Sequence, residues 1–397
     1  MKLKELAASL GIESYPDALE EIYVNLPEDD GSLYDAEKIK ALDDEYGMLG
    51  EHLEYTIEGA EDISKKENLL TWLRLAYEYC KSRTIYEARK FPMPKSDGTP
   101  ATDMFTALLF LAECPEAVKK YNARGLSDEE IKKNLGNLKF HIAIGTVEAG
   151  GRVTLSGRYH WLLNYAKALI LDHNGYNYQP HIWPGDAILL KNKKTGEYVF
   201  IMVRGKFHKS GQVLGSAGAT DEEGSFDAEF EEWTDVFFAH RVKDNTVSRK
   251  RETFLKSEWE AVLRPGDDVI ALHIPRKTNM TEDYVTESLK GGFNLLKKYY
   301  PELSPKCIVC FSWILTPHLG EIIGEEKNLT KFMKRFALYP VLDPKGQYCR
   351  SFVWLGEKGD IETLSEDTSL KRGIKKFWRE GGHLHIHRGV ITDSFDY

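Results

Sequence analysis

Residues 266–300 form the segment that most constrains the fold. The apolar run at residues 269–274 is rich in residues that favour strands, and Pro275 ends it because proline cannot donate to a strand ladder. A short polar loop follows. Apolar residues then recur at spacings of three and four, which predicts a helix with one buried face, made by Val285, Leu289, Phe293, Leu296 and Tyr300. A buried strand that leads into a helix through a polar loop is a common ligand site in α/β proteins.

Length and composition narrow the class of protein. A chain of 397 residues predicts two domains, and 42% hydrophobic residues are enough for real cores. The net charge of −9 argues against nucleic acid or an anionic membrane as the main partner. We find neither a signal peptide nor a run approaching the ~18 apolar residues of a membrane span. The five scattered cysteines do not form a disulfide framework, so we expect a cytoplasmic protein.

The hydrophobic pattern changes near residue 150, which divides the chain. Residues 1–155 show helical periodicity and predict an all-helical N-terminal domain. Residues 156–397 alternate short β-like runs with helices, which predicts a mixed sheet flanked by helices. We expect a hairpin and a loop to be inserted at about residues 185–250, with the polar residues 241–251 forming a loop or a helix start. Residues 351–355 are predicted as a strand.

The loop after Pro275 is the first candidate binding site. Arg276 and Lys277 supply positive charge, while Thr278, Thr281 and the start of the next helix supply hydrogen-bond donors for a pyrophosphate. The alternative is an ordinary capped helix with a solvated basic loop. The two acidic residues in the first turn of the helix favour this alternative, because they would repel a phosphate.

Several polar side chains near the predicted strands are candidates for catalysis. His273 has a suitable side chain for a general base, although its place within an apolar strand favours a hydrogen-bonded core histidine. Ser312 ends a buried strand and either donates to a ligand or satisfies local backbone groups. Tyr348 and Tyr339 are weaker candidates for a general acid. Asn328 begins another predicted helix and either caps it or contacts a ligand.

Two groups of residues, one of cysteines and one of histidines, have side chains that could bind a metal ion. Cys307 and Cys310 lie three apart on an extended strand and so point to opposite faces, which favours core positions. His383, His385 and His387 fall on one face of a strand. They are interpreted as a solvated face in preference to a metal site, and no bound metal is predicted.

One further segment carries a possible acceptor pocket. An Asn- and Gly-rich stretch holds three aromatic residues and two histidines, namely Tyr176, Tyr178, Trp183, His173 and His181. The group either lines a pocket for an acceptor or a sugar-like ring, or belongs to a loop packed on the helical domain, which is the favoured interpretation.

The C-terminal third resembles a known family. The segments VIALHIP, CIVCFSWIL, NLTKFMKRFALYPV and TSLKRGIKKFWREGGHL are similar to the C-terminal domain of a bacterial family of GNAT-like acyltransferases. The segment MFTALLFLAECPEAVKKYNARGLSDEEI resembles the helical N-terminal domain that accompanies it. The resemblance runs from about residue 60 to the end and is best after Asp268.

The resemblance implies an N-acyltransferase that uses acyl-CoA, with an acetyl or longer chain, and a small-molecule or peptide acceptor. Acyl-CoA would lie along a splayed strand, with its pyrophosphate at the N-terminus of the next helix. Catalytic roles would fall to His273, Ser312 and Tyr348. The cofactor would contact a set of seven residues: Ile274, Arg276, Lys277, Thr278, Asn279, Thr281 and Asn328.

The sequence departs from the family pattern in two places. The family loop usually reads Arg/Gln-x-x-Gly-x-Gly/Ala, whereas residues 276–281 contain no glycine, so that backbone amides approach a phosphate less easily. The first strand of the fold is also replaced by LILDHNGYNYQPHIWPGD. These departures favour the alternative hypothesis, a GNAT-like ligand-binding protein that has lost catalysis.

Overall fold

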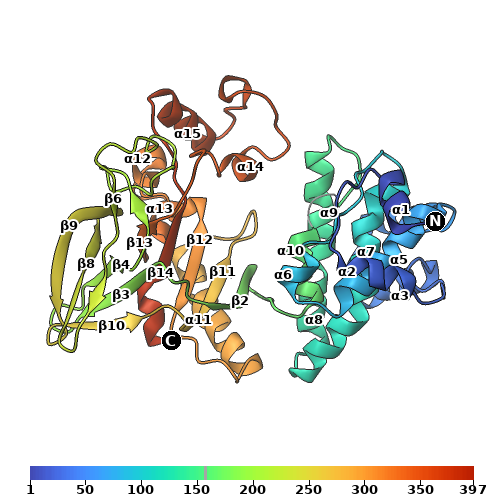
Figure 1. Cartoon of the computed structure of the whole chain (residues 1–397), viewed down its shortest axis with the longest axis horizontal. Coiled ribbons are helices and arrows are strands. Elements are labelled where there is room, and N and C mark those ends of the chain that lie inside the picture. The colour runs from blue at the N-terminus through green and yellow to red at the C-terminus, as the bar shows by residue number, and fades with distance from the viewer. Residues whose placement is uncertain (156–158) are drawn as a thin grey trace. The chain divides into compact units, whose positions relative to one another are not determined.

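The chain folds into two compact units. The computed structural model describes residues 1–155 and 159–397, and the units comprise Met1–Leu171 and Asp172–Tyr397 (Figure 1). The first unit extends beyond the predicted end of the N-terminal domain at residue 155. It does so because helix α10 (Tyr159–Ala166) packs on α7 (Pro100–Ala123) of the same unit.

The first unit is built from helices around α7. The others are α1 (Leu3–Ser9), α2 (Ala18–Val24), α3 (Ala36–Tyr46), α4 (Leu53–Ser64), α5 (Glu67–Lys81), α6 (Ile85–Ala88), α8 (Asp128–Leu135) and α9 (Asn137–Glu148). Residues 103–111 of α7 are buried on every side, and α4, α5, α8 and α10 surround it. Inside this bundle Glu113 accepts a hydrogen bond from Tyr159 (2.8 Å) and pairs with Lys167 (3.0 Å), so its buried charge is compensated.

The second unit contains a mixed six-stranded sheet in the order β1-β2-β11-β12-β14-β13. Its strands are β1 (Leu171–His173), β2 (Tyr176–Ile182), β11 (Asp268–His273), β12 (Ile308–Ser312), β13 (Phe336–Pro340) and β14 (His387–Ile391). Strands β11 and β12 run parallel, whereas β2 pairs with β11, and β14 with β12 and β13, in the antiparallel sense. The predicted fold class, a helical N-terminal part followed by a mixed sheet, is confirmed.

A second antiparallel sheet packs on one face of the first. Its order is β10-β3-β4-β8-β7, with β9 paired to β8. The strands are β3 (Ala187–Asn192), β4 (Tyr198–Met202), β7 (Glu231–Glu232), β8 (Val236–Lys243), β9 (Thr246–Leu255) and β10 (Trp259–Leu263), beside a small ribbon of β5 (Lys206–Phe207) and β6 (Phe226–Asp227). The predicted hairpin is β3–β4. The prediction of a loop or helix start at residues 241–251 is wrong, because these residues continue β8 and begin β9.

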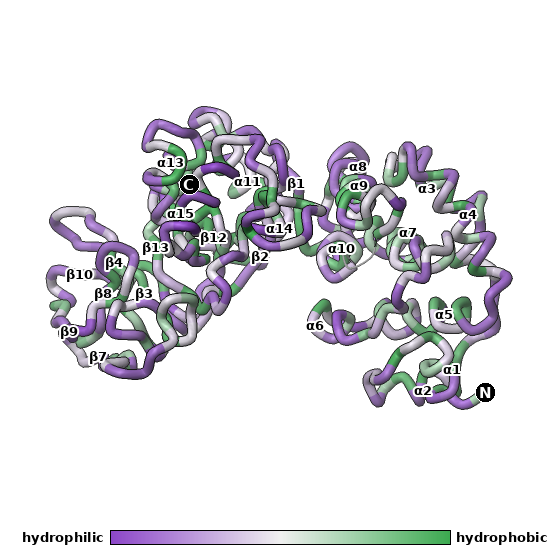
Figure 2. The backbone as a smooth tube through the Cα atoms, turned by 90° about the horizontal axis from the view of Figure 1, so that it is seen from above, coloured by the Kyte–Doolittle hydropathy of each residue, from purple (hydrophilic) through white to green (hydrophobic). Residues whose placement is uncertain are grey.

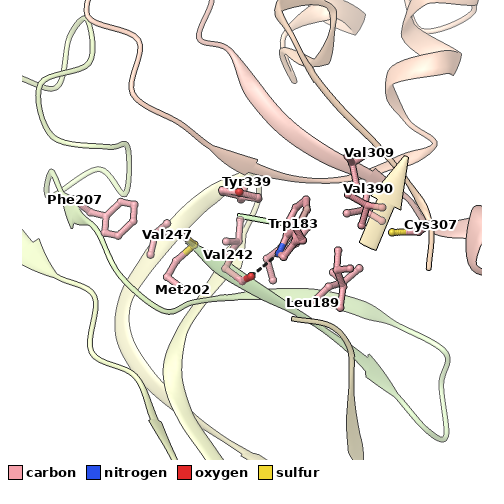
Figure 3. Close-up of a cluster of buried hydrophobic side chains, with 14 residues drawn as sticks. Trp183, Leu189, Met202, Phe207, Val242, Val247, Cys307, Val309, Tyr339 and Val390 are labelled. Atoms are coloured by element: carbon pink, nitrogen blue, oxygen red, sulfur yellow. Dashed lines mark hydrogen bonds between the residues drawn. The ribbon is translucent and has the colours of Figure 1, made fainter. Parts of the chain in front are cut away.

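A core of large apolar side chains joins the two sheets (Figure 3). Trp183 stacks on Phe200 with ring centroids 5.9 Å apart, and Tyr339 meets the Phe200 ring edge-on at 4.9 Å. The indole N–H of Trp183 donates to the carbonyl of Ala187 (2.8 Å), so the buried ring leaves no polar group unsatisfied. Each such ring contributes about 1.5–3 kcal/mol by its burial.

Helix α11 (Glu282–Tyr299) covers the other face of the six-stranded sheet (Figure 1). The apolar face predicted from the spacing is buried, and the Tyr178 hydroxyl donates to the carbonyl of Ser288 (2.8 Å). Hydrophobic residues follow the central strands, whereas outward loops are hydrophilic (Figure 2). The remaining helices are α12 (Leu319–Ile323), α13 (Asn328–Met333), α14 (Arg350–Val353) and α15 (Ser369–Arg379). Residues 351–355 therefore do not form the predicted strand.

Candidate functional site

The parallel strands β11 and β12 separate before they end. Their pairing consists of Ile270 with Ile308 and Ala271 with Val309. Beyond this point β11 continues to His273, still paired with β2, and β12 continues to Ser312, still paired with β14. In the described part of the chain no ladder joins the two ends, so the sheet has a split in its middle. A ligand that offers amide groups can bind in such a split as a strand would.

The peptide groups along the split face an unpaired partner strand. The amide of Ile270 donates to the carbonyl of Cys307 on the β12 side (3.0 Å). Backbone groups alternate in direction along a strand, so those of Leu272 and Ile274 turn the same way. By the same alternation the groups of Phe311 turn toward β11. The split therefore presents hydrogen-bonding groups from both walls.

His273 lies at the end of one wall of the split. Its Nε2 is 3.0 Å from Oε1 of Gln179 on β2. Burial, and then the neighbouring His181, lower the pKa of His273 to about 4, so its ring is neutral at pH 7. In the tautomer whose Nε2 carries the proton, Nε2 donates to the Gln179 oxygen and Nδ1 holds the lone pair. A neutral imidazole at this place can accept a proton.

Ser312 lies at the end of the other wall but on the opposite face of the sheet. The register pairs Ile270 with Ile308, so His273 falls on one face and Ser312 on the other. The Ser312 hydroxyl accepts a weak hydrogen bond from the amide of Ile314 (3.4 Å), which satisfies the local backbone. The two predicted catalytic residues thus flank the split without meeting.

The loop after β11 is tied to the turn between β1 and β2. Thr278 donates through its hydroxyl to the carbonyls of Pro275 (2.7 Å) and Gly175 (3.0 Å), and so braces the loop. Asn279 accepts from both the amide and the hydroxyl of Thr281 at 3.0 Å. Asn279 therefore fixes the residue that precedes α11. These two predicted cofactor contacts shape the loop through their side chains.

Lys277 has a left-handed backbone conformation, with φ of 69°. This is the region in which glycine is the usual residue, and a lysine there is strained by about 1 kcal/mol. Lys277 stands at a position that the family pattern leaves open, whereas Asn279 and Thr281 stand where that pattern has glycine. Arg276 and Lys277 are exposed, and among the described residues neither forms an ion pair. Both charges are available to an anion.

The N-terminus of α11 lies next to this loop. Thr281 is its N-cap residue, and no described side chain accepts a capping hydrogen bond from the first turn. Glu282 is paired with Lys331 of α13 at 2.8 Å, so one of the two acidic residues expected to repel a phosphate is neutralised. Asn328 is exposed at the first position of α13, one turn before Lys331, and Lys327 is the N-cap. Asn328 does not cap the helix.

Tyr348 lies near the split, because its ring contacts Phe311 on β12. Its ring centroid is 6.5 Å from that of Phe311 on β12, and it is 45% exposed. Tyr339 is buried in the core between the sheets, and burial raises its pKa to about 12. Its hydroxyl accepts from Arg388 at 3.0 Å. Of the two tyrosines, Tyr348 is the accessible one.

The residue types considered for metal binding are placed differently. Cys307 and Cys310 are buried as predicted, whereas the interpretation of the histidines as a solvated face is wrong for His385 and His387. Only His383 is exposed, because the strand begins at His387 and the preceding residues are covered. Within residues 1–155 and 159–397 no cluster of His, Cys, Asp or Glu could hold a metal ion.

The comparison with protein families decides what kind of domain this is. The family model of GNAT-like C-terminal domains matches residues 133–391, well over half of the chain. This chain belongs to that family. The resemblance found in the sequence is thereby confirmed. No curated protein matches the chain in sequence.

Solved structures share the whole GNAT-like architecture. Crystal structures of an acyltransferase, in complex with decanoyl-CoA and teicoplanin or with CoA and 10C-teicoplanin, align with a TM-score of 0.68. Each is 16% identical over 98% of this chain and 99% of its own. A mutant acyltransferase in complex with octanoyl-CoA aligns with a TM-score of 0.65. At these identities the likeness shows the fold. No helix of the described residues is long and apolar enough to cross a membrane.

Sequence reasoning included His181 in a possible acceptor pocket but missed Gln179 and Arg388, which lie near the split of this GNAT-like sheet. Burial, and then the charge of Arg388, lower the pKa of His181. Arg388 reaches Asp186 at 3.1 Å. Gln179 and Arg388 carried no signal in the sequence, because each is an isolated polar residue whose partner is distant along the chain. The alternating pattern of β2, once recognised as a strand, places Gln179 and His181 on one face with Asn177.

Proposed function

We propose that this protein is an N-acyltransferase that moves an acyl group from acyl-CoA to the amine of a small-molecule or peptide acceptor. The observation that carries the proposal is the split between β11 and β12, which leads to an uncapped helix N-terminus beside two unpaired cations. A chain of amides ending in a pyrophosphate matches this arrangement, with the amides in the split and the phosphates at the helix. The acyltransferase structures with bound CoA and acyl-CoA support the same ligand class.

The reaction is a direct transfer. The acceptor amine attacks the thioester carbonyl, a C–N bond forms and the C–S bond breaks. The amine loses one proton and the departing CoA thiolate gains one. His273 accepts the proton from the amine, either directly or through water, and Tyr348 supplies the proton to sulfur. Holding the two substrates together supplies most of the acceleration.

The pyrophosphate site is assigned to the loop and helix start. Arg276 and Lys277 provide charge, the first-turn amides of α11 provide donors, and Asn328 approaches from α13. The pairing of Glu282 with Lys331 reduces the local negative charge. The teicoplanin complexes of the related fold support a small-molecule acceptor for this chain as well.

Calorimetric titration with CoA and decanoyl-CoA tests the proposal. We expect both to bind, and Arg276→Glu with Lys277→Glu to weaken binding by about 100-fold or more, because two favourable charges become repulsive. The matched control is Lys194→Glu with Lys250→Glu, an equal charge change at exposed sites on the second sheet. Absence of binding to the unaltered protein would contradict the proposal.

Turnover separates the enzyme from the alternative of a binding protein without catalysis. Thiol release from decanoyl-CoA in the presence of a mixture of primary amines measures transfer. Binding without any amine-dependent thiol release, for a broad set of amines, would favour the alternative. The observation that favours this alternative is that residues 276–281 contain no glycine, since Asn279 and Thr281 occupy the positions where the family pattern has it.

A further inference from the structure

Three exposed aromatic side chains form a strip beside the split. Phe311, Tyr348 and Phe352 are 49%, 45% and 47% exposed. The ring centroids are 6.5 Å apart for Phe311 and Tyr348, and 5.5 Å apart for Tyr348 and Phe352. Contiguous exposed apolar surface is uncommon on soluble proteins and marks binding sites. We call these three residues the aromatic strip.

The aromatic strip begins at the candidate site itself. The last pair of β11 and β12 is Ala271 with Val309, so two residues further on His273 faces Phe311 across the split. Both side chains lie on the same face of the sheet, the face opposite to the one that α11 covers. A molecule lying on the strip therefore reaches the imidazole of His273 at one end.

A positive charge lies beside the strip. The guanidinium carbon of Arg388 is 5.5 Å from the Phe311 ring centroid. Arg388 pairs with Asp186 at 3.1 Å, and Arg204 pairs with the same carboxylate at 3.0 Å. Two guanidinium groups thus share one carboxylate, which leaves one positive charge uncompensated within the group.

The guanidinium of Arg388 also has hydrogen-bond donors that its contacts do not use. Both of its contacts, to Asp186 and to the Tyr339 hydroxyl, are made by Nη1. Among the described residues no hydrogen bond is made by its Nη2 or Nε. A guanidinium edge with unused donors is suited to bind a carboxylate.

We infer that the acyl acceptor combines a planar aromatic group with a carboxylate, the ring lying on the aromatic strip and the carboxylate on Arg388. The inference rests on the proposed function, since it names the substrate class of the same site. Stacking on Phe311 and Tyr348 orients the ring, the ion pair fixes its direction, and the acceptor amine is held near His273.

The charge next to the strip favours the acceptor over the acyl chain as its occupant. An alkyl chain gains binding free energy when apolar walls enclose it, and a neighbouring guanidinium adds nothing to that free energy. Phe311, however, is flanked by Arg388 and has about half of its surface open to water. Flat rings and a neighbouring cation suit a flat anionic molecule.

The test measures binding of three small amines to the full-length protein saturated with CoA, by saturation-transfer NMR. L-phenylalanine carries ring and carboxylate, phenethylamine lacks the carboxylate, and L-cyclohexylalanine lacks the planar ring. We expect L-phenylalanine to bind about tenfold more tightly than either of the others, from one stacking contact or one charge-assisted hydrogen bond. Octanoyl transfer to each amine is followed in parallel by thiol release.

Variants assign the preference to named residues. Phe352→Ala and Phe311→Ala are expected to raise the KM for L-phenylalanine by about 3- to 10-fold, and Arg388→Gln to abolish the preference over phenethylamine. The dissociation constant of octanoyl-CoA should stay unchanged in Phe352→Ala. Trp233→Ala is the control for loss of an exposed ring, and Arg264→Gln the control for a guanidinium paired to one carboxylate.

Three results would overturn the inference. One is equal binding of the three amines, and another is a preference that survives Arg388→Gln and Phe311→Ala. The third is a loss of affinity for octanoyl-CoA relative to acetyl-CoA in Phe352→Ala, which would assign the strip to the acyl chain. Absence of CoA binding is a separate result that contradicts the proposed function, and the amine titration without CoA then still decides the acceptor preference.

Discussion

His273 on β11 and Gln179 on β2 are joined by a 3.0 Å contact between Nε2 and Oε1, which holds the imidazole at the edge of the split. Gln179 pairs with Ala271, the residue at which β11 and β12 part. The contact therefore orients the ring at the point where a ligand would enter.

Replacing His273 tests its role in proton transfer. His273→Gln is expected to lower kcat by about 100- to 10,000-fold, the usual contribution of a positioned base, with little change in the dissociation constant of decanoyl-CoA. Gln179→Leu removes the orienting contact and should lower kcat less. A His273→Gln variant with unchanged kcat would leave this histidine as a structural residue.

The pH dependence of kcat/KM follows from the low pKa of His273. Because that pKa is about 4, His273 stays neutral above pH 5, and the profile should show no inflection near 6.5. Instead kcat/KM should rise with the deprotonation of the acceptor amine. Profiles measured with two acceptors of different amine pKa check this. An inflection between pH 6 and 7 that disappears in His273→Gln would contradict it.

Lys277→Gly is expected to have opposite effects on stability and on binding. Glycine relieves the positive φ and should raise the free energy of unfolding by up to about 1 kcal/mol. Loss of the lysine charge should weaken CoA binding by about tenfold. Urea unfolding and calorimetry measure the two quantities. Lys194→Gly, at an exposed turn position, is the control. Unchanged CoA affinity would remove Lys277 from the proposed phosphate site.

Replacement by alanine is expected to lower the free energy of unfolding by different amounts at two neighbouring glycines of α11. A Cβ at Gly292 would lie 2.2–2.4 Å from ring atoms of the buried Tyr178, which cannot move away. Gly292→Ala is therefore expected to destabilise by about 2 kcal/mol or more, although alanine is the better helix former. At Gly291 the Cβ would meet the less buried ring of His173. Gly291→Ala is expected to cost less, and urea unfolding of both variants gives the comparison.

Buried histidines predict loss of stability in acid. His387 is 1% exposed, and burial lowers its pKa to about 4, whereas in the unfolded chain it is about 6.5. Between these values the unfolded state binds more protons, so the free energy of unfolding falls as the pH drops from 6.5 to 4. For His387 the loss amounts to about 1–3 kcal/mol at pH 4.

His387→Gln should flatten this part of the stability curve. Urea unfolding at several pH values between 4 and 8 measures it. The difference should persist in about 0.5 M salt, because it arises from burial and is only weakly screened. Parallel curves for the variant and the unaltered protein would show that another group titrates.

The strand and helix around the split were predictable because their signals are local. The apolar run of β11, Pro275 and the spacing of the α11 face lie within 35 residues and agree with one another. The start of α15 was predictable for the same reason, since Thr368 accepts from the amide of Lys371 (3.2 Å) as an N-cap does.

Other elements escaped prediction because distant partners define them. Residues 241–251 are polar, yet most of them form strands, because β8 pairs with β9 and with β4 in the folded sheet. Ion pairs of Arg241 with Glu197 (3.1 Å) and of Arg251 with Glu231 (2.6 Å) accompany this pairing. In the site, Arg388 and Asp186 are 202 positions apart. No local pattern marks such a pair.

The split between β11 and β12 also creates two strand edges inside a sheet. Edges with unpaired peptide groups are the usual templates for association with other chains. Here the edges are short, because only the residues beyond Ala271 and Val309 are unpaired, and such edges suit a short chain of amides, such as a pantetheine arm. Occupation by such an arm would complete the ladder and slow hydrogen exchange at Ile274 and Phe311. The shortness of the same edges would also limit pairing of the empty protein with its own copies.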